Sequence, residues 1–137
     1  MKPIILDTNI VVRLVTSDDK EKQEKAAALF DQVEKGKITA FIPDVIFAEI
    51  IFVLVSKKLY NLPKKTIQDI LLPIIGLPHV KFHRKRNTKR ALEFFVKYDL
   101  DFEDALIATY AERGGNTIYS FDSDFEKIPS VIYKQPS

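Results

Sequence analysis

Short runs of apolar residues along this chain alternate with longer segments in which apolar residues recur at helical spacing. The short runs are rich in branched residues and lack polar alternation, which is typical of strands buried on both faces of a parallel sheet. We therefore predict strands at residues 4–6, 39–42, 80–82, 117–121 and, at an edge, 131–133. The longer segments predict helices at residues 10–15, 20–36, 44–58, 63–73, 88–98 and 102–113.

Residues that favour helix ends mark several of these boundaries. Asn9 and Asn87 are each placed to cap the helix that follows them, and residues 17–19 provide a start signal for the second helix. Gly36 marks the end of that second helix, because glycine adopts the left-handed conformation common just past a helix. Pro73 is expected to end the fourth helix, since proline cannot donate the backbone hydrogen bond that continues it.

Strands that alternate with helices of ten or more residues predict crossover connections. The expected fold class is therefore α/β, with a mainly parallel central sheet and helices on both of its faces. No linker, repeat or low-complexity segment interrupts the 137 residues, so we predict one domain over residues 1–137. In open sheets of this kind, ligands bind outside the carboxyl ends of the strands.

The amino-acid composition excludes several kinds of catalytic and metal-binding site. The chain has no Cys, which excludes disulfides, thiolate metal sites and a Cys nucleophile, and which fits a reducing cytoplasm. The apolar run near the start is too short for a signal peptide. The longest apolar run, residues 45–55, contains Glu49 and is shorter than the roughly 20 residues that a membrane span needs. We expect a cytoplasmic protein without a membrane partner.

Four carboxylates stand where the predicted fold would form a site. Asp7 follows the first strand and Asp122 follows the fourth. Glu49 interrupts an apolar helix, where an unpaired ionised carboxylate is very costly to bury, so it needs a partner or an opening to water. Asp104 lies in the first turn of a helix. Each has an ordinary alternative: a turn, a cap, a buried ion pair, or an acid favoured by the helix dipole.

A divalent cation would resolve the repulsion among four such carboxylates. Mg²⁺ and Mn²⁺ take hard oxygen ligands and are commonly held by a few carboxylates together with substrate phosphate. Such a cation supports attack of activated water on a phosphodiester, so no His is required as a base. His79 and His83 are a poor alternative pair, because four residues of strand would separate them by about 13 Å.

These acids lie within four motifs that resemble those of the PIN-domain ribonucleases. LDTN at 6–9, IPDVIFAEI at 42–50, DFEDALIATYAERGG at 101–115 and SFDSDF at 120–125 have the order and spacing of that family. The likeness covers essentially the whole chain and is closest to the VapC toxins of prokaryotic toxin–antitoxin pairs. It implies a PIN-like three-layer α/β/α sandwich.

The resemblance also implies roles for individual residues. The acids that match the catalytic metal site, for one or two Mg²⁺ or Mn²⁺, are Asp7, Glu49, Asp104 and Asp122. Matching polar support comes from Thr8, Asn9 and Ser120, with Asp124 as an outer candidate. The family more often has Thr where Ser120 stands, but the hydroxyl is kept. Asp101 occupies a position that is not usually acidic, and its role stays open.

The function that the resemblance implies is a metal-dependent endoribonuclease whose products carry a 5′-phosphate and a 3′-hydroxyl. It further implies a homodimer and a small antitoxin whose C-terminal tail covers the acidic groove. The family also contains RNA-processing nucleases, and a PIN-like module that binds RNA or protein without cutting is a further alternative. A dehalogenase-type phosphotransfer domain is disfavoured, because that pattern needs a second Asp where Asn9 stands.

One segment, residues 81–90, is strongly basic on an otherwise acidic chain. It holds six of the 21 Lys and Arg residues and no acid, which leaves 15 basic against 19 acidic residues elsewhere. Charge runs are usually solvated surface, but Lys89 and Arg90 fall near a predicted helix start, where the dipole disfavours cations. We therefore predict contacts with RNA phosphates. The residues concerned are Lys81, Arg84, Lys85, Arg86, Lys89 and Arg90.

Overall fold

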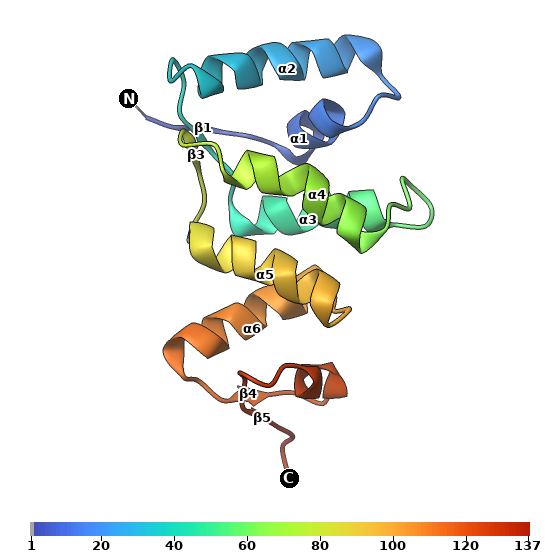
Figure 1. The fold of residues 1–137 in the computed structure, drawn as a ribbon, viewed down its shortest axis with the longest axis vertical. Coiled ribbons are helices and arrows are strands. Elements are labelled where there is room, and N and C mark those ends of the chain that lie inside the picture. Colours follow the sequence, from blue (N-terminus) through green and yellow to red (C-terminus); the bar gives the residue numbers. More distant parts are fainter. Residues whose placement is uncertain (1) are drawn as a thin grey trace. The chain divides into compact units, whose positions relative to one another are not determined.

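The computed structural model describes residues 2–137, and its helices and short strands alternate along the chain (Figure 1). In chain order the elements are β1 (Ile4–Ile5), α1 (Thr8–Val15), α2 (Lys20–Glu34), β2 (Ala40–Phe41), α3 (Asp44–Val55), α4 (Lys64–Ile75), β3 (Val80–Lys81), α5 (Lys85–Lys97), α6 (Phe102–Gly114), β4 (Ile118–Tyr119), the 3₁₀ helix η1 (Ser123–Lys127) and β5 (Tyr133–Lys134). Within the described residues, no helix is long and apolar enough to cross a membrane.

The chain forms two compact units that meet in sequence at the start of α5. The first unit ends at Lys85, and the second runs from Arg86 to Ser137. In Figure 1 the first unit is coloured blue to yellow-green and the second yellow to red. Each unit has its own set of paired strands and its own buried apolar residues. The single domain over residues 1–137 stays a prediction.

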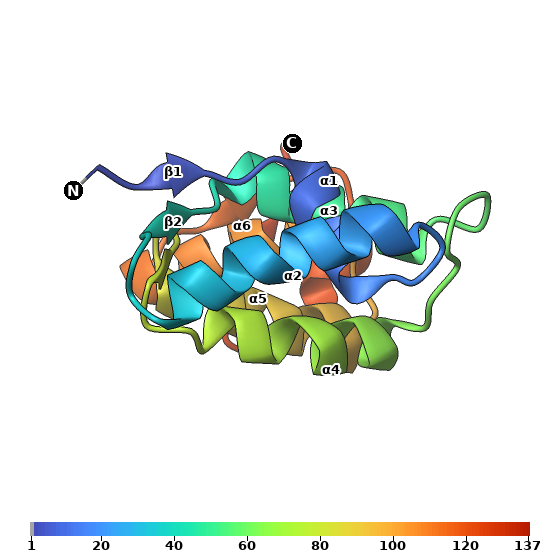
Figure 2. The same ribbon diagram turned by 90° about the horizontal axis from the view of Figure 1, so that it is seen from above.

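The first unit is built on a parallel sheet with strand order β1-β2-β3. Ile4 pairs with Ala40, and Ala40 pairs in turn with Val80. Helices α1 and α2 connect β1 to β2, and helices α3 and α4 connect β2 to β3, so both connections are helical crossovers (Figure 2). Helix α1 packs against α2 and α3. The predicted α/β class with parallel strands is confirmed, although each strand is shorter than predicted.

Burial explains how the apolar helix α3 sits in this unit. Phe47, Ile50, Ile51 and Leu54, spaced by three, four and seven residues from the first, are all at most 1% exposed. This is the spacing of one helix face turned towards a core. Phe52, on the other side, is 62% exposed. The helix therefore has one buried face and one apolar face that is open to solvent.

Three predicted helix boundaries are wrong. Helix α1 begins at Thr8 with Asp7 at its N-cap, so Asn9 lies inside the helix. Helix α5 begins at Lys85, which places Asn87 in its first turn, where it is only 5% exposed. Helix α4 continues two residues beyond Pro73, since a proline in the last turn removes only one backbone bond while the residues after it, Ile74 and Ile75, are buried.

The second unit consists of α5, α6, η1 and a parallel pair of strands. Ile118 of β4 pairs with Tyr133 of β5, so the last strand lies slightly beyond its predicted range. Phe95 and Phe102 meet edge to face, with ring centroids 6.2 Å apart, where α5 packs on α6. As predicted, α6 ends at the glycine pair: Gly115 is left-handed, with φ of 67°, and its N–H donates to a carbonyl of α6.

Candidate functional site

Asp7 ends the first strand because it also begins the first helix. Leu6 before it is 1% exposed and Thr8 after it is 3% exposed, so the backbone is held on both sides while Asp7 itself is exposed. The Asp7 carbonyl accepts the N–H of Ile10 at 3.1 Å. Its side chain makes no capping hydrogen bond. The carboxylate is therefore not committed to the helix that it starts.

The hydroxyl of Thr8, the residue that follows Asp7, is buried. Its Oγ1 has no hydrogen-bond partner among residues 2–137. An unsatisfied buried hydroxyl costs about 1–3 kcal/mol, so its retention fits a polar site better than an apolar core. Asn9 is exposed and lines a pocket of about 300 Å³ between α1 and α2, whose other lining residues are Ile10, Arg13, Lys22, Lys25, Ala26 and Leu29.

Glu49 is exposed on α3, although it lies between the buried residues Phe47 and Ile50. The helical turn directs its side chain away from the face that these two residues bury. The alternative of a buried ion pair is therefore wrong, and the carboxylate has its opening to water. Asp7 and Glu49 are the two candidate acids of the first unit.

Asp104 lies half-buried in the first turn of α6 in the second unit. Burial, followed by the negative charges of Asp122, Asp101, Glu103 and Asp124, raises the pKa of its carboxyl above the usual value. Asp101 stands at the N-cap, but its side chain makes no capping hydrogen bond. A cation near Asp104 would relieve both the desolvation and the repulsion, because each disfavours the ionised form.

Asp122 is held by a local turn at the start of η1. The Ser120 hydroxyl accepts the N–H of Asp122 at 3.0 Å, and Oδ1 of Asp122 accepts the N–H of Asp124 at 2.9 Å. Asp124 forms an ion pair with Lys127 at 3.2 Å. The turn thus fixes the orientation of the Asp122 side chain and uses one of its two carboxylate oxygens.

The candidate acids are divided between the two units. Among residues 2–137, no group of three or more His, Asp or Glu side chains is placed to hold a metal ion. The four-acid site therefore stays a prediction. The chemistry of the donors fits Mg²⁺ or Mn²⁺ all the same, since every candidate offers carboxylate oxygens and the acids around Asp104 create a negative potential.

The basic segment at residues 81–90 contains both exposed and anchored cations. Lys81, Arg84, Arg86 and Lys89 are exposed. Lys85 is half-buried and donates to the carbonyl of Leu77 at 3.0 Å. Burial and, secondly, the positive charge of Lys81 lower the pKa of Lys85. Lys85 is thus bound to the fold itself, whereas the other four side chains are mostly open to solvent.

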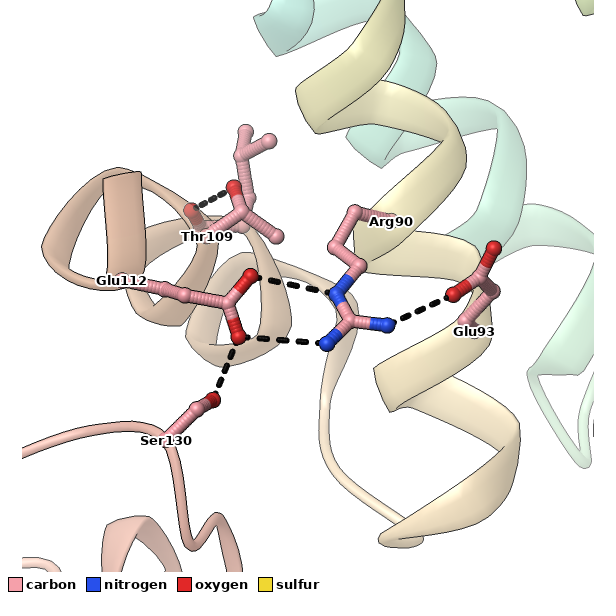
Figure 3. Close-up of polar contacts among 6 residues, drawn as sticks. Arg90, Glu93, Thr109, Glu112 and Ser130 are labelled. Atoms are coloured by element: carbon pink, nitrogen blue, oxygen red, sulfur yellow. Dashed lines mark hydrogen bonds and ion pairs between the residues drawn. The ribbon is translucent and has the colours of Figure 1, made fainter.

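Arg90 donates hydrogen bonds to acceptors on two helices, although its side chain is 45% exposed (Figure 3). Its Nε and Nη2 donate to the two carboxylate oxygens of Glu112 at 3.1 and 3.2 Å, and its Nη1 donates to Glu93 at 2.9 Å. Its Cζ lies 4.6 Å from the ring centroid of Phe94. The hydrogen bonds that Arg90 donates to Glu112 and Glu93 raise the pKa of Arg90. A spacing of three residues on one helix is enough to bring Arg90 and Glu93 together. Nothing local in the sequence indicates the contact between Arg90 and Glu112.

A family model of the PIN domain matches residues 4–131. The chain belongs to the PIN-domain family. This match confirms the predicted family and its α/β fold class. PIN domains are generally nucleases. A crystal structure of VapBC2 from Rickettsia felis, bound to a DNA fragment from their promoter, is similar with 21% identity over 98% of both chains and a TM-score of 0.41. A search of curated proteins found no match.

Proposed function

We propose that this PIN domain is a Mg²⁺- or Mn²⁺-dependent endoribonuclease and the toxin of a VapBC-type toxin–antitoxin pair. The observation that carries the proposal is the match of residues 4–131 to the PIN domain, a family whose members are generally nucleases. The half-buried Asp104, which follows Asp101 and Glu103 at the start of α6, supports the same assignment. Membership of a nuclease family and the motifs that resemble VapC toxins support the same conclusion. Processing of cellular RNA is the alternative role for the same chemistry.

In this proposal the ligands of the cation are the four acids that match the family's metal site, Asp7, Glu49, Asp104 and Asp122. When bound, the cation supplies Lewis-acid chemistry that activates water and stabilises charge on the phosphate. The chain's own contribution is to present the oxygen ligands. Ser120 and the N–H of Asp124 orient Asp122, and the carboxylate of Asp7, which makes no capping hydrogen bond, stays available as a ligand. Products with a 5′-phosphate and a 3′-hydroxyl are expected.

The RNA would be held through its phosphates by the exposed cations of residues 81–90. Lys81, Arg84, Arg86 and Lys89 are accessible for this role. Neutralising phosphates releases counterions, which makes binding weaken as salt rises. The contribution from Lys85 is expected to be smaller because its side chain is half-buried, and that from Arg90 because the carboxylates of Glu112 and Glu93 already neutralise its charge.

We also propose a homodimer and a small antitoxin as protein partners. The outer face of α3 supports a protein contact, since Val45 is 73% and Phe52 62% exposed. An antitoxin could inhibit by directing an Arg at the carboxylates, because a guanidinium pairs bidentately with a carboxylate and replaces the charge of the cation. Sedimentation that shows only a monomer at micromolar concentration would refute the dimer.

The first test is a calorimetric Mn²⁺ titration of the partner-free protein beside Asp104→Asn. We expect the variant to lose most of the binding, because it removes one anionic ligand while keeping the side-chain size. Asp69→Asn is the matched control, since Asp69 is an exposed acid on α4 whose carboxylate forms an ion pair with Lys65 of the same helix. Equal binding by the wild type and Asp104→Asn, or no binding by either without RNA, would favour a non-catalytic binding module or a site that is completed only by substrate.

A further inference from the structure

Three elements of the second unit are joined by one polar network. Arg90 of α5 donates two hydrogen bonds to Glu112 of α6, and the Ser130 hydroxyl, in the segment after η1, donates to the same carboxylate (Figure 3). We call these three residues the Arg90–Glu112–Ser130 brace. Paired N–H donors on one carboxylate give a strong and directional contact, because the guanidinium fork matches the two oxygens.

Two neighbouring side chains of α5 make further contacts with the brace. Phe94 lies against the Arg90 guanidinium, and Glu93 occupies the guanidinium nitrogen that Glu112 does not use. The Glu112 side chain is 27% exposed, so its hydrogen bonds are partly shielded from water. The hydrogen bond from Arg90 lowers the pKa of Glu112, with a smaller contribution from Ser130. Glu112 is thus held as a carboxylate that links two partners.

The elements joined by the brace are those that carry two of the candidate acids. Asp104 and Glu112 lie eight residues apart on α6, which corresponds to about 12 Å of rigid helix. Asp122 precedes η1, and Ser130 follows it, also eight residues later. Fixing Ser130 to Glu112 therefore limits how far the segment from Asp122 to Ser130 can move relative to α6.

We propose that Arg90, Glu112 and Ser130 are positioning residues that set the separation of Asp104 and Asp122. This inference rests on the proposed function, because it assigns the brace to the metal site of that nuclease. It also gives the guanidinium of Arg90 a structural role within the protein, in contrast to the RNA-binding role proposed for the other Lys and Arg residues of the basic segment.

The test compares Glu112→Gln with Glu93→Gln. Each variant removes one carboxylate from Arg90 and keeps the side-chain size, but Glu93 lies on the same helix as Arg90 and therefore joins no second element. The first readout is amide hydrogen exchange of residues 122–131 without metal. The second is Mn²⁺ affinity by calorimetry, on protein whose circular dichroism shows it to be folded.

We expect exchange of residues 122–131 to quicken in Glu112→Gln and to stay at the wild-type rate in Glu93→Gln. Mn²⁺ affinity should fall about 10-fold in Glu112→Gln alone, the loss typical when support of a metal ligand is removed. Unchanged exchange in Glu112→Gln, or equal effects of both variants, would overturn the positioning role. A wild type that binds no Mn²⁺ would instead refute the proposed function, and exchange alone would then decide whether the brace holds this segment.

If Glu112→Gln does not fold, Ser130→Ala decides the matter by the same two readouts. Ser130 is exposed, and its replacement removes only the link to the segment after η1. Quicker exchange of residues 122–131 with weaker Mn²⁺ binding supports the brace. Exchange and affinity equal to the wild type overturn it.

Discussion

Removing the exposed cations of the basic segment should flatten the salt dependence of RNA binding. The perturbation is the triple variant Arg84→Ser/Arg86→Ser/Lys89→Ser, which leaves the anchored residues Lys85 and Arg90 in place. Each phosphate contact on single-stranded nucleic acid contributes about −0.7 to the slope of log K against log salt. Three lost contacts should therefore reduce the slope by about 2.

This change in slope is large enough to measure. Between 50 and 200 mM salt, the wild type should lose about 20-fold more affinity than the triple variant, as follows from a slope difference of about 2 over a fourfold salt range. The assay is fluorescence anisotropy with a labelled single-stranded RNA of mixed sequence. Both proteins should carry Asp104→Asn and be measured in chelator, so that no cleavage takes place.

The control removes the same charge from elsewhere on the surface. Lys37→Ser/Lys57→Ser/Lys58→Ser replaces three exposed Lys residues outside the basic segment. If binding depends on net charge alone, the two triple variants will show the same slope. An unchanged slope in the first variant, or equal slopes in both, would refute the assignment of phosphate contacts to residues 84–89.

Three further predictions concern stability. Gly115→Ala should destabilise the protein by about 1–2 kcal/mol in urea unfolding, because its φ of 67° strains an L-residue although no atom lies within 4 Å of an added Cβ. Gly76→Ala, at a φ of −73°, is the near-neutral control. Equal effects of the two substitutions would contradict the argument from backbone strain. Leu71→Ala, at a fully buried side chain, should cost about 2–5 kcal/mol, and a loss below 1 kcal/mol would show that the site collapses around the cavity. Glu112 has a pKa in the folded state below its ordinary value of 4.5, so it adds stability above that pH that is lost as the pH falls through the lowered pKa. The free energy of unfolding of Glu112→Gln should therefore fall less steeply with decreasing pH in this range than that of the wild type. Equal pH dependence of the two proteins would contradict the pKa shift caused by Arg90.

Local patterns in the sequence were sufficient for the element order, because apolar periodicity and end signals act within one element. Asp19 caps α2 through the N–H of Lys22, and Gly115 ends α6, both near the expected positions. The start of α5 was predicted wrongly, because burial of Asn87 within the helix outweighed its preference for a capping position. The end of α4 was predicted wrongly for the same reason, since buried residues beyond Pro73 continue the helix.

The candidate site was only partly accessible to sequence reasoning. Asp7 and Asp122 follow strands as expected, since strand ends can be located from local pattern. The exposure of Glu49 could not be predicted, because the sequence of a helix that is apolar nearly all round does not reveal which face is buried. The partnership of Arg90 with Glu112 spans 22 residues and depends on how α5 packs on α6, which no local signal encodes.

The pairing of β4 with β5 makes the support of Asp122 depend on residues that follow it in the chain. The strand that leads to Asp122 pairs with Tyr133 and Lys134, and the N–H of Ser120 donates to the Lys134 carbonyl. During synthesis, Asp122 therefore leaves the ribosome before the strand that supports it. On the proposed function, the acidic site is complete only after residues 133 and 134 have been made and have paired with β4.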